Sequence, residues 1–88
     1  MDTKKYKLLV RAVELNSLTL AGRELGLTQS GASRAIGELE KEIGFPLLTR
    51  NRAGVKLTAS GNLVLPAVRT ILAGEEQLEQ INSKQKRR

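Results

Sequence analysis

A single glycine between two short helical patterns is the feature that most restricts how this chain can fold. Apolar residues recur at helical spacing over about 18–25 and again over about 29–43, and Gly26 separates the two segments. Glycine readily adopts the left-handed backbone conformation that follows a helix end, because it has no Cβ atom. Two short helices joined by so tight a turn predict a helix-turn-helix, placed here at about 18–37.

The chemistry at the helix ends supports these boundaries. Ser17 and Thr28 each precede a predicted helix, where a side-chain hydroxyl accepts a free backbone N–H of the first turn. Ala21 and Gly22 are small enough to let the two helices approach closely. The expected core between the two helices consists of Leu18, Leu25, Leu27, Ala32 and Ile36.

The segments on either side complete a small, mostly α-helical domain. A first amphipathic helix is predicted at about 4–15, and Gly44 ends the third helix shortly before Pro46. Two short apolar runs around a polar, glycine-containing loop predict a β-hairpin at about 47–57. The expected fold is therefore a winged helix-turn-helix over residues 1–58, with a three-helix core and the hairpin as its wing.

A long helix follows the wing. Thr58 is its expected N-cap, and helical periodicity continues to about Asn82. We therefore predict a linker and dimerisation helix over 59–82 and a frayed basic tail over 83–88. About 24 residues extend roughly 36 Å, which is too long to bury against so small a domain. Pro66 has no backbone N–H, so it should bend this helix or remove one of its hydrogen bonds.

Composition excludes several classes of protein. The chain has 88 residues, enough for one small domain, and contains no Cys and no His. Disulfides, thiol catalysis and the usual zinc sites are thereby excluded, and no glycine-rich phosphate loop follows a strand. We therefore expect neither an enzyme nor a cofactor or metal site in this chain. The polar N-terminus and the lack of a long apolar run predict a cytoplasmic protein without signal peptide or membrane span.

Charge is distributed unevenly along the chain. The net charge is +6, of which residues 84–88 contribute four, so the total alone says little about a partner. Residues 44–74 contain basic residues but no acidic one, whereas acidic residues gather at 38–42 and 75–79. The acidic group at 38–42 is interpreted as a solvated helix face. This segregation indicates a surface for a polyanion such as nucleic acid.

Side chains suited to reading DNA are grouped at the start of the third predicted helix. Gln pairs with adenine, Arg with guanine, and Ser with bases or phosphates, while free N–H groups at a helix start favour a phosphate. A packed three-helix unit whose polar face is only solvated is the alternative. The predicted DNA-binding residues of this segment are Thr28, Gln29, Ser30, Gly31, Ser33 and Arg34.

The predicted wing adds positive charge directly after this helix. Arg50, Arg52 and Lys56 have no acidic residue between them, which favours contacts with DNA phosphates. Exposed loops also carry charge for solubility alone, and that is the alternative interpretation of these three residues.

Several of these motifs occur together in one known arrangement. They comprise Asn16–Thr19, Ala21, Leu25–Ser30, Ala32–Ile36, Leu39–Gly44, Leu47–Arg50 and Val55–Gly61. In this order and spacing, the chain resembles the N-terminal domain of LysR-type transcriptional regulators over essentially all of residues 4–80. The resemblance implies a winged-helix homodimer on a pseudo-palindromic DNA site. It places four side chains near bases or phosphates, namely Gln29, Ser30, Ser33 and Arg34, and the three wing cations on the backbone or in the minor groove.

The chain departs from that family pattern at four positions. Gly22 stands where alanine is frequent, which should loosen the second helix by roughly 1 kcal/mol. Ser30 stands where proline is frequent in the family, and Ala32 stands where a larger apolar residue is frequent. Ala53 stands where a basic residue is frequent. These changes should affect which DNA sequence is bound and how tightly, and Ala53 argues against insertion of the wing into the minor groove.

Family members are much longer than this chain. The resemblance therefore implies that a small-molecule effector binds only in an absent C-terminal domain. The chain is then part of a longer protein or, alternatively, a stand-alone regulator.

The final predicted helix has apolar residues on more than one face. Leu63, Leu65, Val68 and Leu72 are expected to pack on the body of the domain. A second face suggests a partner copy, whereas one broad stripe folded onto the same domain is the alternative. The predicted dimer seam, spaced alternately by three and four residues, is Val64, Ala67, Ile71, Gly74, Leu78 and Ile81.

These observations predict sequence-specific binding of double-stranded DNA by a homodimeric transcription regulator. A winged-helix module for protein interaction or dimerisation, without specific DNA reading, is the alternative from another functional class. A related winged-helix regulator with a different sensing domain is a third interpretation.

Overall fold

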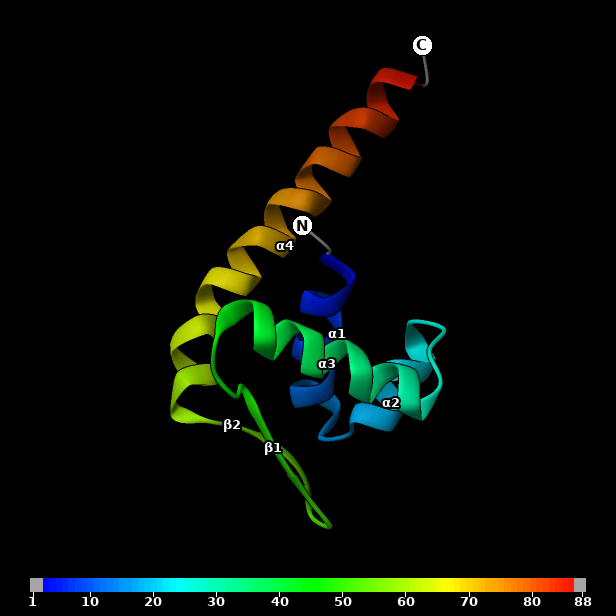
Figure 1. Cartoon of the computed structure of the whole chain (residues 1–88). Coiled ribbons are helices and arrows are strands. Elements are labelled where there is room, and N and C mark those ends of the chain that lie inside the picture. The colour runs from blue at the N-terminus through cyan, green and yellow to red at the C-terminus, as the bar shows by residue number, and fades with distance from the viewer. Residues whose placement is uncertain (1–2, 87–88) are drawn as a thin grey trace.

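The computed structural model describes residues 3–86. Helices α1, α2 and α3 form the body of the domain, a two-stranded hairpin extends from it, and α4 projects well beyond it (Figure 1). This is the predicted mostly helical architecture. The elements in chain order are α1 (Thr3–Leu15), α2 (Leu18–Glu24), α3 (Gln29–Ile43), β1 (Leu48–Asn51), β2 (Gly54–Leu57) and α4 (Ala59–Lys86).

The predicted helix ends are confirmed. The Ser17 hydroxyl accepts the Leu20 N–H at 3.1 Å at the start of α2, and the Thr28 hydroxyl accepts the Gly31 N–H at 3.0 Å at the start of α3. Gly26 has a φ of 74°, the left-handed conformation expected of it in the turn between these helices. Local hydrogen bonds thus delimit both helices of the helix-turn-helix.

The core lies where α1 meets the other helices and the base of the wing. Helix α1 contacts α2, α3, α4 and β2, so it is the central element of the domain. Each of these elements contributes an apolar face, and packing those faces together stabilises the domain. The largest fully buried side chains are Leu8, Leu9, Ile36, Leu39, Leu47 and Val68.

A missing side chain lets α2 and α3 pack closely. Gly22 is buried, and a Cβ atom built on it would lie 2.9 Å from the Cβ of Ala32. Gly22 therefore lowers the intrinsic helix propensity of α2, as predicted, but also makes room for α3 at the point where the two helices cross. Two of the departures from the family pattern, at Gly22 and Ala32, thus lie against each other.

The base of the wing is fixed by side chains from both neighbouring helices. Strands β1 and β2 are antiparallel. The Glu40 carboxylate accepts the backbone N–H groups of Leu47 and Leu48 at 2.6 and 3.1 Å, and Thr58 donates to the Pro46 carbonyl at 2.7 Å. The interpretation of Glu40 as part of a solvated face is therefore wrong, because its carboxylate anchors the hairpin to α3. Thr58 also accepts the Gly61 N–H at 2.9 Å, which confirms it as the N-cap of α4.

Helix α4 is longer than predicted. It continues through Pro66 and on to Lys86, so residues 83–86 are helical instead of frayed, while residues 87–88 lie outside the described part. Lys and Gln are good helix formers, and Lys84 and Lys86 in the last turn interact favourably with the helix dipole. Within residues 3–86, no helix is both long enough and apolar enough to cross a membrane.

The rotation of α4 differs from the prediction at three positions. Leu63 was expected to pack on the body, but its side chain is 82% exposed. Val64 and Ile71, predicted to lie in the dimer seam, are instead partly buried against the core of the same chain. The body therefore covers a face of α4 that includes part of the predicted seam, and leaves Leu63 open.

Candidate nucleic-acid interface

The first turns of α3 are open to solvent. Gln29, the first residue of α3, is exposed, as are Ser30 and Arg34. Ala32 and Ile36, on the side of the helix opposite Ser30 and Arg34, are 0% and 1% exposed. Burial of the apolar side against α1 and α2 turns the polar side outward. Helix α3 therefore has the arrangement that a recognition helix requires, because its first turns are not covered by the rest of the domain.

Three further residues predicted at this site lie in the same opening turns. Thr28 is exposed and fixes the helix start, while Gly31 and Ser33 are half-buried. A Cβ atom at Gly31 would lie 3.1 Å from the Thr28 hydroxyl oxygen, so the small residue permits the capping geometry. Gly31 thus leaves room for the Thr28 cap of α3, and it also adds no side chain to the surface that faces a partner.

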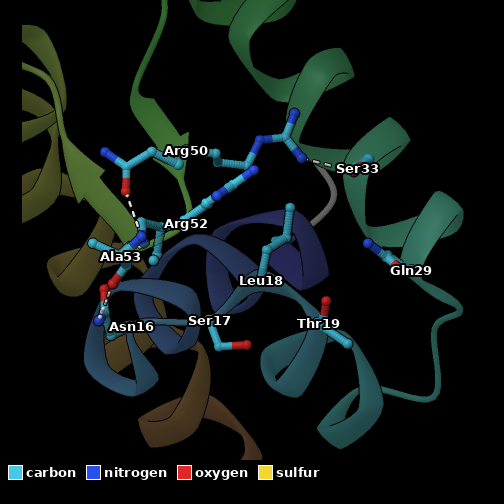
Figure 2. A pocket seen from close by; sticks show the side chains of 12 residues that line it. Asn16, Ser17, Leu18, Thr19, Gln29, Ser33, Arg50, Arg52 and Ala53 are labelled. Carbon is cyan, nitrogen blue, oxygen red and sulfur yellow. Dashed lines mark hydrogen bonds between the residues drawn. The ribbon is translucent and has the colours of Figure 1, made fainter.

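The wing and α3 are joined by a direct hydrogen bond. The Arg50 guanidinium donates to the Ser33 hydroxyl at 2.7 Å, and in Figure 2 the side chains of both Arg50 and Arg52 extend from the wing toward α3. Lys56 is exposed on β2 but does not line the space between the wing and α3. Two of the three predicted wing cations are therefore brought to the recognition helix, and the third lies elsewhere on the hairpin.

The wing, α3 and the start of α2 enclose an open concavity of about 390 Å³. Gln29 and Ser33 line it from one side, and Arg50 and Arg52 from the other (Figure 2). The described residues that line it include no carboxylate. A hollow lined by two guanidinium groups, three carboxamides and several hydroxyls suits a phosphate group bound beside a base edge.

Four polar lining residues were not predicted as site residues from the sequence, and one of them, Asn51, belongs to the wing itself; the other three precede or begin α2. Ser17 and Thr19 contribute hydroxyl groups from the start of α2, and Asn16 contributes an amide from the turn before it (Figure 2). All three belong to the motif Asn16–Thr19 that carries the family resemblance, but only Ser17 was given a role, as a helix cap. They join the site because the hairpin lies against the turn between α1 and α2, where Asn16 bonds to the backbone of Ala53 and Val55.

Acidic side chains are paired away from this surface. Glu38 and Glu42 bind Lys5 at 3.4 and 3.0 Å, and the Glu24 carboxylate accepts two hydrogen bonds from Arg11. These bonds from the Arg11 guanidinium hold the pKa of Glu24 below its ordinary value.

The predicted DNA-binding cations stay free of such pairing. Within residues 3–86, Arg34, Arg50, Arg52 and Lys56 form no ion pair. The positive charge of the candidate site is therefore available to an external anion.

Comparison with known sequences decides the family. The sequence model described as "Bacterial regulatory helix-turn-helix protein, lysR family" matches residues 3–62. The chain belongs to this family. The matched region covers all of α1–α3, both strands of the wing and the beginning of α4.

Two curated relatives of this chain are HTH-type transcriptional proteins. The regulator YvbU of Bacillus subtilis (strain 168) is 36% identical over 87 residues, covering 98% of this chain and 30% of that protein. The activator BauR of Pseudomonas aeruginosa is 39% identical over 75 residues, covering 85% of this chain and 25% of that protein. The chain thus spans less than a third of the length of these relatives.

A solved structure matches the lysR-family chain over nearly its whole length. It is the BenM_DBD/catB site 1 DNA complex, with a TM-score of 0.84 and 30% identity over 96% of this chain and 94% of that one. The structural match includes the long helix as well as the winged body, since it extends well past residue 62.

Proposed function

We propose that this chain is the DNA-binding part of a bacterial transcription regulator that binds double-stranded DNA sequence-specifically. Helix α3 enters the major groove, and the wing lies along the phosphate backbone or at the adjoining minor groove. The observation that carries the proposal is the exposed polar start of α3 beside two wing arginines. Arg50 hydrogen-bonds to Ser33 of α3, and neither arginine forms an ion pair within residues 3–86. The DNA complex of BenM_DBD, a similar domain with 30% identity, supports the same role.

The exposed residues divide into base readers and phosphate binders. Gln29 and Arg34 have side chains that form two hydrogen bonds with adenine and guanine respectively, so they read bases in the groove. Arg50, Arg52 and Lys56 bind phosphates and set the register of the domain on the duplex. The hydroxyl groups of Ser30 and Ser33 can form hydrogen bonds with bases or with phosphates. Binding of this kind is not catalysis, takes place in the cytoplasm and needs no cofactor.

Helix α4 supplies the dimer contact. We define its outer face as Leu63, Ala67, Gly74, Leu78 and Ile81, all of which are exposed. At about 100° per residue, this face points roughly 120° away from the residues that pack on the body. An apolar face that its own domain leaves open fits a second copy, and a two-fold dimer matches a pseudo-palindromic site.

Selection from a random DNA pool tests the central proposal. Bound duplexes should converge on a pseudo-palindromic sequence, and their affinity should fall steeply with added salt. Failure to enrich any sequence, together with no salt-dependent binding, would instead support a winged-helix module for protein interaction.

The Lys56→Ala variant should weaken binding to every duplex alike. Lys56 is exposed on β2 and outside the concavity, so it is suited to a phosphate and not to a base. Loss of one phosphate contact should flatten the slope of log affinity against log salt by about 1. Fluorescence anisotropy on the selected site and on random DNA measures this, with Lys41→Ala at the far end of α3 as the control. An unchanged slope removes Lys56 from the phosphate contacts.

The Leu78→Ala variant should weaken the dimer about tenfold, because each copy loses part of an apolar contact. Leu78 is 66% exposed in the single chain, so its truncation has little effect on the body of the domain. Sedimentation equilibrium at several protein concentrations measures the change. Gln80→Ala, on another side of the same helix, is the matched control, and equal effects of the two variants would contradict pairing through the outer face.

A further inference from the structure

Asn16 links the turn between α1 and α2 to the wing. Its amide Nδ2 donates to the Ala53 carbonyl at 2.9 Å, and its Oδ1 accepts the Val55 N–H at 3.0 Å. Figure 2 shows the Asn16 side chain directed at Ala53, on the side of the concavity away from α3. One side chain therefore satisfies an acceptor and a donor of the hairpin backbone, 37 and 39 residues further along the chain respectively.

The shape of the wing fits this amide. A Cβ atom at Gly54 would overlap the Asn16 carboxamide, so the amide occupies space that only glycine leaves free. Asn16 itself has a φ of 53°, a conformation that asparagine tolerates better than most residues. The turn is held by hydrogen bonds from the Asn16 N–H to Val13 and from the Ser17 N–H to Ala12. A rigid turn thus aims this side chain at the wing.

Two side-chain links in the described part of the chain join the outer half of the wing to the helix-turn-helix. One is the amide of Asn16, and the other is the bond from Arg50 to Ser33. Arg50 and Ser33 are both proposed DNA contacts, so their mutual bond is exchanged when DNA binds. The Asn16 amide is already engaged by two backbone groups of the wing and is not a proposed DNA contact, so we expect this link to remain when DNA binds.

We propose that Asn16 is a positioning residue that holds the tip of the wing where Arg50 and Arg52 face α3. This inference rests on the proposed DNA-binding function and adds a side chain that fixes the position of the wing relative to α3. A wing already held in the binding arrangement loses less conformational freedom when DNA binds, which raises affinity without any contact from Asn16 to the DNA.

The Asn16→Gly variant tests this role, because glycine keeps the left-handed turn and removes only the amide. Affinity for the selected DNA site should fall about tenfold, as expected for the loss of two hydrogen bonds that order the wing. The same substitution in a protein that already carries Arg50→Ala and Arg52→Ala should change affinity less than twofold, because the wing then has no arginine to position. Anisotropy at low salt keeps the weak variants measurable, and amide hydrogen exchange at Val55 should accelerate in Asn16→Gly.

The outcomes separate the two proposals. Failure of the wild-type protein to bind any duplex contradicts the DNA-binding function itself. Wild-type binding that Asn16→Gly leaves unchanged overturns the positioning role, and so does an equal loss in both backgrounds, which would indicate a general effect on folding. A tenfold loss confined to the background with intact arginines supports it.

Discussion

Replacing Arg34 by alanine should lower affinity for the selected DNA site by about 5–150-fold per half-site, equivalent to roughly 1–3 kcal/mol. Arg34 is exposed in the opening turns of α3 and forms no ion pair within residues 3–86, so its guanidinium is free to form two hydrogen bonds with a guanine edge. A base reader loses affinity mainly on the correct sequence. Discrimination at one base pair of each half-site should therefore collapse in Arg34→Ala.

Anisotropy titrations measure this effect on the selected site, on its single-base-pair variants and on random duplex DNA. Arg34→Lys is the matched control, because lysine keeps the positive charge but lacks the planar fork that reads guanine. It should retain binding to random DNA and still lose the discrimination. Equal losses by Arg34→Ala on selected and random DNA would show that Arg34 serves only a phosphate.

Replacing Gly61 by alanine should destabilise the domain by about 3 kcal/mol, although alanine is intrinsically the better helix former. Gly61 is buried in the first turn of α4, and a Cβ atom on it would overlap the carbonyl oxygen of Leu47 and lie 2.9 Å from Leu57 Cδ2. The Leu47 carbonyl also accepts the Thr58 N–H at 2.9 Å, so it cannot move away without losing that bond. For a domain of this size, the melting temperature should fall by about 12–24 °C.

The matched control for Gly61→Ala lies in α3. A Cβ atom at Gly37 meets no heavy atom within 4 Å, so Gly37→Ala should stabilise the domain by up to about 1 kcal/mol through helix propensity alone. Thermal and urea unfolding of the two variants measure the contrast. Stabilisation by both substitutions would contradict the close contact between α4 and the base of the wing.

Much of the fold followed from short-range patterns. The caps at Ser17, Thr28 and Thr58 and the left-handed turn at Gly26 were predicted correctly, because each depends on groups at most four residues apart. The exposed start of α3 was also predicted, since helical periodicity alone places Arg34 opposite Ile36. The polar surface offered to a partner was thus largely visible in the sequence.

The contacts that organise the wing were not visible in the same way. Glu40 lies among other acidic residues, and nothing nearby in the chain marks it as the acceptor for Leu47 and Leu48. Asn16 reaches backbone groups of Ala53 and Val55 that meet it only after the hairpin has folded back. Such pairs are decided by where distant segments meet, so local periodicity carries no signal for them.

Helix α4 marks the division most clearly. The sequence alone predicted that this helix exists, where its N-cap lies, and that it has more apolar residues than one face can hold. These features depend on composition and spacing along a single helix. Which residues turn inward was decided only by tertiary packing. Gly61 and Val68 are buried against the body, so the helix is rotated to leave Leu63 outside and to bring Val64 and Ile71 partly inside. Helical spacing determines the angles between side chains on one helix, but the rotation of the whole helix is set by the shape of the core against which it packs.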